Sequence, residues 1–287
     1  MKISGFTIIK NAIINDYPVV EAITSILPMV DEMIVGIGNC DDDTKTLIQS
    51  ISSDKIKIFD SVWDMSLRKG GQVLAVETDK ALAHVSPDSD WAFYIQADEI
   101  IHEKYHSTIL AEAAKYKDDK NIEGLLFKYE HFYGSYDYVG DSRKWYRREI
   151  RIIRNDKNIH AYRDAQGFRK NNKKLKVKLI DAYVYHYGWV KNPDQMKEKI
   201  KNFTRLYDDD NAAQLKAEIF NYNDFDSLQK FTGTHPAVMK RRIEQKNWNL
   251  EFDITRKKMS FTKRFLYWFE NLTGRRLFEY KNYTIIP

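Results

Sequence analysis

The chain has 287 residues, of which 43% are hydrophobic and 14% aromatic, and a formal net charge of +5. This length and composition exclude a disordered chain and allow a sizeable core, in one elaborated α/β domain or a domain with an appendage. The single Cys40 excludes an intramolecular disulfide, and no apolar run reaches the length of a membrane span, which predicts a cytoplasmic protein.

The first hundred residues alternate between short apolar strands and helices. Strands are predicted at 3–9, 33–37, 56–59 and 91–96, and helices at 19–27, 44–51 and 72–84. This alternation predicts a parallel sheet covered on both faces, with ligands bound beyond the carboxyl ends of its strands. Polar clusters follow these strands at that edge.

The pattern changes after residue 125. Strands at 125–129, 150–153 and 182–186 are separated by irregular, basic, aromatic-rich segments, and the chain from residue 193 is predicted to be mainly helical. Residues 1–125 carry a net charge of −9 and the remainder +14. An acidic half suits cation binding, whereas a basic half suits phosphate or an anionic surface.

A hydrophobic strand carries carboxylates to the edge of the predicted sheet in the segment 93–99 (FYIQADE). Hard divalent cations take such oxygen ligands and can bridge the phosphates of a nucleotide. The alternative is that Asp98 and Glu99 cap a helix that starts near Ile100. This segment alone favours neither interpretation.

The order of these motifs resembles the family 2 glycosyltransferases, in particular the branch whose first strand ends in Lys-Asn and whose metal motif reads Asp-Ala-Asp-Glu. The matching residues are Lys10-Asn11, Asp42 and Thr44 in the turn after the second strand, and 96–99, where Gln96 replaces the first acid. The resemblance is clearest over 3–105 and extends to about 205. It implies a GT-A-type α/β fold, with a mostly parallel Rossmann-like sheet flanked by helices, an acceptor-region extension and C-terminal helices.

The resemblance also implies roles for segments and residues. Residues 1–125 would form the nucleotide-sugar-binding half, 126–205 the acceptor-binding half and 206–287 a C-terminal helical appendage. A divalent metal, Mn²⁺ or Mg²⁺, would be held by Asp98 and His186, although His186 could also be a structural histidine among tyrosines. The donor-binding residues would be Lys10, Asn11, Asp42, Arg68, Lys69, Gln72 and Gln96.

An inverting transfer needs a base that removes the proton from the acceptor hydroxyl. Glu149 is the first candidate and Asp164 the second, with Asp141 a further carboxylate of this region. The arginines of the segment 145–153 (WYRREIRII) are expected to hold Glu149 ionised. The same crowding also fits a structural ion-pair network.

The segment 255–278 combines an aromatic stripe with many cations. Such a helix could lie on an anionic membrane surface, where lipid-linked acceptors are found, or it could pack on its own domain. The stripe at helical spacing is Phe261, Phe265, Trp268, Phe269 and Leu272, and the flanking cations are Arg256, Lys257, Lys258, Lys263, Arg264, Arg275 and Arg276.

We therefore predict a glycosyltransferase that moves a sugar from a nucleotide-sugar donor to a glycan or lipid-linked saccharide, with metal assistance and inversion. One alternative is a nucleotidyltransferase on a related fold. Another is a non-catalytic sugar- or nucleic-acid-binding module, favoured by the basic, tyrosine-rich region 128–190. The sequence contains no RNA-recognition signature, so nucleic acid is not the expected partner.

Overall fold

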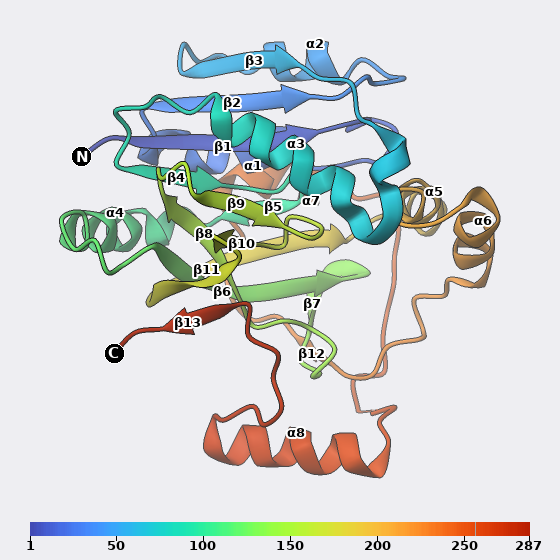
Figure 1. Ribbon diagram of the computed structural model, residues 1–287. Helices are drawn as coiled ribbons and strands as arrows, with labels where there is room; N and C mark the ends of the chain where they lie inside the picture. Colours follow the sequence, from blue (N-terminus) through green and yellow to red (C-terminus); the bar gives the residue numbers. More distant parts are fainter. Residues whose placement is uncertain (256) are drawn as a thin grey trace.

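The structure, a computed structural model, describes every residue of the chain except Arg256. Its strands are β1 (Ile3–Ile9), β2 (Glu32–Ile37), β3 (Ile56–Asp60), β4 (Trp91–Tyr94), β5 (Glu99–Ile101), β6 (Gly124–Tyr133), β7 (Ser135–Gly140), β8 (Arg148–Arg154), β9 (Ile159–Tyr162), β10 (Gly167–Lys170), β11 (Lys173–Trp189), β12 (Leu228–Lys230) and β13 (Tyr283–Ile285). Its α-helices are α1 (Val19–Ile26), α2 (Thr44–Gln49), α3 (Gln72–Ala83), α4 (His106–Lys115), α5 (Pro193–Thr204), α6 (Asp210–Ile219), α7 (Lys240–Glu244) and α8 (Phe261–Thr273). One sheet runs through the molecule in the order β3-β2-β1-β4-β8-β6-β11-β10-β9, and the other strands pair with it off this path (Figure 1).

The strands β3, β2, β1 and β4 are parallel, which confirms the predicted alternation of strands and helices. Side chains alternate across β1, since Ile3 and Ile9 pack in the core that includes α1, whereas Phe6 and Ile8 pack in the core that includes α3. In Figure 1, α3 lies in front of these strands and α1 behind them. Every residue of β1 is buried because helices cover both faces of this half of the sheet.

The second half of the sheet is mixed. β8 runs antiparallel between β4 and β6 and so joins the parallel half to β6 and β11, which are parallel to each other. The β9–β10 hairpin extends the sheet beyond β11. The fold class is therefore the expected α/β arrangement, in which a parallel first half continues into a mixed extension and C-terminal helices.

The local structure excludes one of the open alternatives and adds strands that were not predicted. The chain at Ile100 is not helical, because β5 pairs antiparallel with β11 there and the next α-helix starts only at His106. Asp98 and Glu99 therefore do not cap a helix. The chain after residue 125 also contains more strand than expected, because β7, β9, β10, β12 and β13 are only three to six residues long and carry little apolar pattern.

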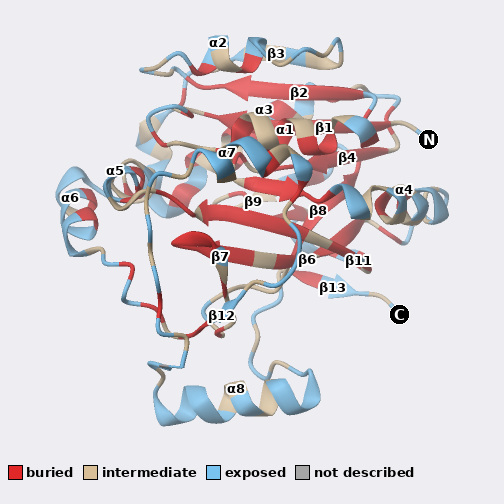
Figure 2. Cartoon of the chain, turned by 180° about the vertical axis from the view of Figure 1, so that it is seen from behind, coloured by how far each residue is buried: buried red, intermediate tan, exposed pale blue. Residues whose placement is uncertain are grey.

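The last helix, α8, stands apart from the sheet. It hangs below the body on two extended connections (Figure 1), and none of its residues is buried (Figure 2). The returning chain adds β13 to the edge of β11. Among the residues that the structure describes, no helix combines the length and apolar composition needed to cross a bilayer.

Candidate active site

A cavity of about 740 Å³ lies beyond the carboxyl ends of β1 and β4. Lys10 and Asn11 follow β1, Gln96 and Asp98 follow β4, and His186 comes from the last part of β11. The helix α5 closes one side of the cavity and lies next to these strand ends in Figure 1. Strand ends that meet at one edge of a parallel sheet explain why residues from four chain segments converge there.

The loop after β1 is held by the turn after β2. The Asn11 side chain donates to Asp41 Oδ2 at 2.9 Å, and the Asp41 amide donates to Asn11 Oδ1 at 2.8 Å. Asp42 instead accepts the amides of Ile13 and Ile14 at 3.0 and 2.9 Å. Asp41 lines the cavity, whereas Asp42 does not. Asp42, which was expected to bind the donor, instead organises the loop after β1.

Asp98 lies beside a lysine and a histidine. Lys199 Nζ donates to Asp98 Oδ2 at 3.0 Å, and His186 Nε2 lies 3.7 Å from Asp98 Oδ1. Burial alone would raise the pKa of Asp98, but the charge of Lys199 and its hydrogen bond oppose this and hold the pKa well below its usual range. Lys199 also donates to the Gly188 carbonyl at 2.7 Å, which fixes its ammonium in the cavity wall.

A chain of hydrogen bonds sets the tautomer of His186. His131 Nε2 lies 2.8 Å from the Tyr146 carbonyl, so this nitrogen must donate. Burial, with the nearby His186, holds the pKa of His131 well below its usual range, so its Nδ1 is an acceptor for His186 Nδ1 at 3.3 Å. Burial also lowers the pKa of His186. The lone pair of His186 Nε2 therefore faces the carboxylate of Asp98 with no proton between them.

The residues present fit a divalent cation whose coordination shell is completed by a bound nucleotide and water. Asp98 and His186 offer one carboxylate oxygen and one imidazole nitrogen, both as free electron pairs. Within the described part of the chain, no cluster of three or more His, Cys, Asp and Glu side chains forms a complete cation site. The protein would thus supply two ligands, and phosphate oxygens and water would supply the rest, as is common for Mg²⁺ at nucleotide sites.

Glu99 is a structural neighbour of this site. It is fully buried, and its carboxylate accepts hydrogen bonds from Arg151 Nε at 2.7 Å, Arg151 Nη2 at 2.6 Å and the Tyr129 hydroxyl at 2.6 Å. Its Oε2 also accepts a hydrogen bond from the backbone N–H of Gln96 at 3.1 Å. This paired carboxylate anchors the turn that carries Asp98 into the cavity.

A second cavity, of about 1000 Å³, adjoins the first. Lys69, Gln72 and Glu149 line only this second cavity, whereas Asp164 lines both. Arg68 lines neither of them. Of the seven residues expected at the donor, the first cavity therefore brings together Lys10, Asn11 and Gln96.

Glu149 is buried, and two of the three arginines near it are engaged elsewhere. Arg147 pairs with Glu279 and Arg151 with Glu99. Burial raises the pKa of Glu149 to about 8, although the charge of Arg151 opposes this shift. The expectation that neighbouring arginines keep Glu149 ionised near neutral pH is therefore wrong. Glu149 Oε1 accepts a hydrogen bond from the Gln166 side-chain amide at 2.9 Å, and Glu149 Oε2 has no hydrogen-bond partner among the described residues.

Asp164 lies at the junction of the two cavities. Its Oδ2 accepts the Tyr207 hydroxyl at 3.3 Å. Gly71 packs against both side chains, since a Cβ built there would lie 2.6 Å from the Tyr207 ring and 2.8 Å from Asp164 Cβ. The third carboxylate, Asp141, accepts the Tyr267 hydroxyl at 2.7 Å and lines neither cavity.

Sequence reasoning missed several residues of this site. Lys199 was visible only as one of several lysines in a helix, and His131 and Tyr207 only as members of aromatic segments. Each one reaches Asp98, His186 or Asp164 through the tertiary fold. A motif-based interpretation has no signal for such contacts, because the partners are tens of residues apart.

No protein-family model and no curated protein matches the sequence. Among solved structures, S. aureus TarS aligns at 17% identity and a TM-score of 0.41, over 70% of this chain and 39% of that one. Glucosyl-3-phosphoglycerate synthase from Mycobacterium tuberculosis, in complex with Mn²⁺, UDP and phosphoglyceric acid, aligns at 19% identity and a TM-score of 0.30, over 45% of this chain and 43% of that one. The 4-diphosphocytidyl-2C-methyl-D-erythritol synthase from Anaerococcus prevotii aligns at 12% identity and a TM-score of 0.41, over 69% and 94%. The chain thus spans less than half the length of the first two proteins.

Proposed function

We propose that the protein is a glycosyltransferase that uses a nucleotide-sugar donor in the first cavity. The observation that carries this proposal is the convergence of Asp98, His186 and Lys199 at the carboxyl ends of the sheet, inside a cavity of about 740 Å³. Cavities of this size accommodate ligands of nucleotide-sugar dimensions. The order of the Lys-Asn and Gln-Ala-Asp-Glu motifs along the chain supports the same assignment.

The diphosphate of the donor would lie against Lys199 and Lys10. Both ammonium groups line the cavity, and Lys199 is held in place by Asp98 and Gly188. Fixed cations stabilise the negative charge that develops on a departing nucleoside diphosphate. A divalent cation, Mn²⁺ or Mg²⁺, held by Asp98 and His186 would add Lewis-acid stabilisation of the same charge.

The base would be Asp164, with Glu149 as the second candidate. Asp164 borders both cavities, so it can reach an acceptor hydroxyl in one and the anomeric carbon in the other. The proton of the hydroxyl would pass to the Asp164 carboxylate as the oxygen bonds to the anomeric carbon. The bond from that carbon to the diphosphate breaks in the same step, which inverts the configuration.

The second cavity would receive the acceptor, a glycan or a lipid-linked saccharide. Its wall includes Lys144, Arg148 and Arg163, and none of these three forms an ion pair with another described residue. Unpaired cations in a cavity wall favour a negatively charged ligand, which here means an acceptor that carries phosphate or carboxylate groups.

Donor binding tests this function most simply. The protein with Mn²⁺ should be stabilised thermally by one member of a panel of nucleotide sugars, by about 2.7 kcal/mol at a hundredfold excess over Kd. Asp98→Asn should lose most of that stabilisation, whereas Asp54→Asn, at an exposed site outside both cavities, should keep it. If no nucleotide sugar stabilises the protein, or Asp98→Asn responds like the wild type, the assignment of the first cavity fails.

A further inference from the structure

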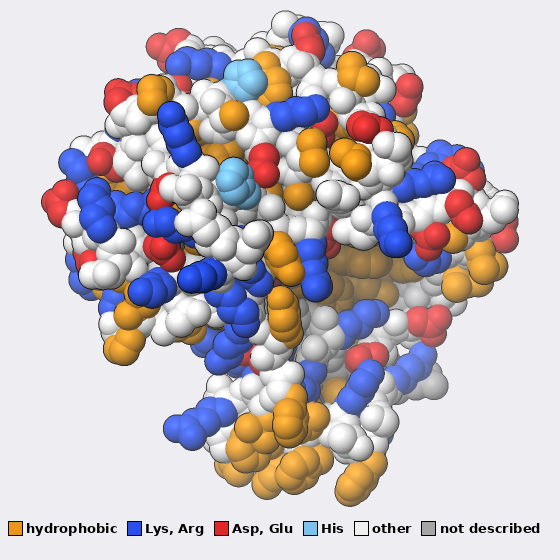
Figure 3. Space-filling model, in the orientation of Figure 1, with side chains coloured by type: hydrophobic (Ala, Val, Ile, Leu, Met, Phe, Trp, Pro, Cys, Tyr) orange, Lys and Arg blue, Asp and Glu red, His pale blue; other side chains and the backbone are white. Residues whose placement is uncertain are grey.

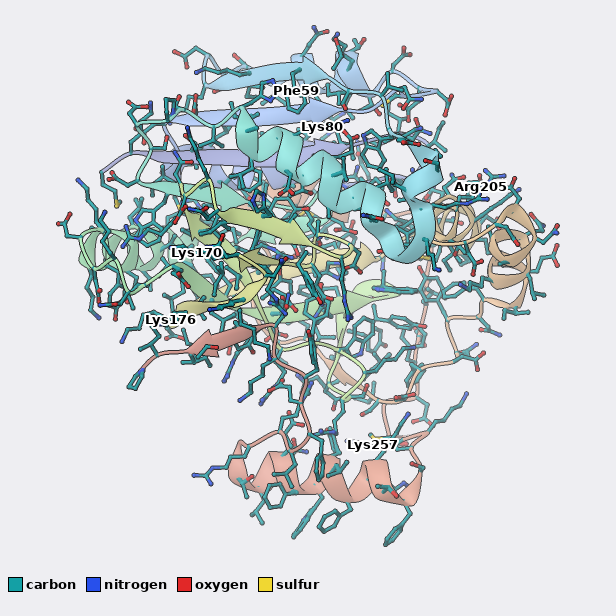
Figure 4. The ribbon with its side chains drawn as sticks, in the orientation of Figure 1. Phe59, Lys80, Lys170, Lys176, Arg205 and Lys257 are labelled. Atoms are coloured by element: carbon teal, nitrogen blue, oxygen red, sulfur yellow. The ribbon has the colours of Figure 1, made fainter. Side chains whose placement is uncertain are left out.

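The helix α8 is amphipathic, but its apolar face points away from the protein. Phe261, Phe265, Trp268 and Leu272 fall within about 60° of one another at 3.6 residues per turn. Between 52% and 88% of each of these side chains is exposed. A surface helix normally turns such a stripe toward the core. In Figure 4, ring side chains extend from the side of α8 that faces away from the sheet.

The polar face of α8 fixes this orientation. Tyr267 donates its hydroxyl to Asp141 at 2.7 Å, and Arg143 pairs with Glu270 at 2.7 Å. Arg276, just after the helix, donates to both oxygens of Glu270 at 2.8 and 2.9 Å. These contacts bind the inner side of the helix to the loop before β8. The outward stripe is therefore a consequence of specific contacts made by the polar side.

The segment that carries the stripe is mostly cationic. The sequence from 255 to 281 contains eight Lys and Arg residues but only two acids, Glu270 and Glu279. Both acids are turned inward and paired with arginines, and their side chains are only 11% exposed. The surface that α8 presents is therefore apolar and cationic, as the orange patch with blue borders in Figure 3 shows. Lys257 lies near the start of the helix (Figure 4), and the neighbouring Arg256 lies outside the described residues.

We propose that this face of α8 docks the protein onto an anionic lipid bilayer. Aromatic side chains between cations match the boundary between acyl chains and negatively charged headgroups. A second copy of the chain is disfavoured as the occupant, because it would bring two clusters of positive charge together. The helix also projects from the body on two extended connections, so its apolar face is free of the rest of the protein.

Vesicle co-sedimentation without any sugar nucleotide tests this inference, so the result does not depend on the proposed activity. The protein should bind vesicles of equimolar phosphatidylcholine and phosphatidylglycerol, and bind phosphatidylcholine alone far more weakly. Phe265→Ser/Trp268→Ser should weaken binding about tenfold or more, since it removes the inserted rings. The matched control Leu215→Ser/Ile219→Ser, on the 59% and 67% exposed positions of α6, should bind like the wild type.

A charge variant provides the second arm. Lys263→Gln/Arg264→Gln should weaken binding to the anionic vesicles roughly tenfold or more, whereas Lys240→Gln/Arg241→Gln on α7 should not. All these positions are exposed, so unchanged thermal unfolding verifies that each variant folds. Absence of wild-type binding, equal binding of the α8 and control variants, or self-association through α8 in place of vesicle binding would each overturn the proposal.

Discussion

The buried carboxyl of Glu149 makes stability depend on pH in a predictable direction. Its pKa is raised from 4.5 to about 8 in the folded protein, because burial penalises the charged form. Between these two values the folded state keeps a proton that the unfolded state has lost. The free energy of unfolding therefore falls as pH rises from 4.5 to 8, and this contribution is constant above 8.

Glu149→Gln should remove this dependence, since glutamine stays neutral and can retain the contact with Gln166. A pKa rise from 4.5 to about 8 corresponds to a ceiling of about 5 kcal/mol at about 1.4 kcal/mol per pH unit. Relaxation around an ionised carboxylate lowers the expected gain to about 2 kcal/mol at pH 8.

The measurement is urea denaturation of the wild type and Glu149→Gln at several pH values from 5 to 8. The variant should become more stable relative to the wild type as pH rises. Glu251→Gln, at an exposed position, serves as the matched control and should show no such trend. A difference between Glu149→Gln and the wild type that stays constant over this range would refute the burial argument.

Three further predictions concern residues that hold the site. Arg151→Met should cost about 3–5 kcal/mol in urea denaturation, because it leaves Glu99 charged and unpaired in the interior, and adding Glu99→Gln should recover part of the loss. Gly71→Ala should cost about 1–3 kcal/mol, because its φ is +73° and the new Cβ would lie 2.6 Å from a tyrosine ring. Gly70→Ala, with φ of +68° but open space around it, should cost only about 1 kcal/mol, so equal losses would contradict the packing argument. His131→Phe should weaken Mn²⁺ binding in the presence of nucleotide about 10–100-fold by isothermal titration, since it frees the imidazole of His186 to rotate, and unchanged affinity would contradict that role.

The parallel half of the fold could be predicted because its strands and helices each carry a complete local signal. β1 and β2 are buried along their whole length, and each carries apolar residues at both odd and even positions. The strand β11 was predicted only over 182–186, although its first residues alternate lysines with apolar residues, a period that itself indicates a strand. The conformation at Ile100 was ambiguous, since pairing of β5 with a strand some 80 residues later decides it.

The candidate site could be predicted where one chain segment carries the signal. Asp98 follows a buried strand, and the sheet topology alone places it at the carboxyl edge. The charge state of Glu149 could not be inferred, because the sequence shows three nearby arginines but not that two of them pair with Glu99 and Glu279. Burial, which sets its pKa, is a property of the packed structure.

The bond that the protein breaks tests the central claim most directly. The chain, Mn²⁺ and the nucleotide sugar that stabilises it are incubated with and without candidate acceptors, and the nucleotide product is identified by chromatography and mass spectrometry. We predict release of a nucleoside diphosphate, at a rate that falls about a hundredfold or more in Asp98→Asn and by a similar factor in Asp164→Asn when acceptor is present. Release of pyrophosphate from a nucleoside triphosphate, with nucleotide sugars left intact, would contradict glycosyl transfer and assign the cavity to nucleotidyl transfer.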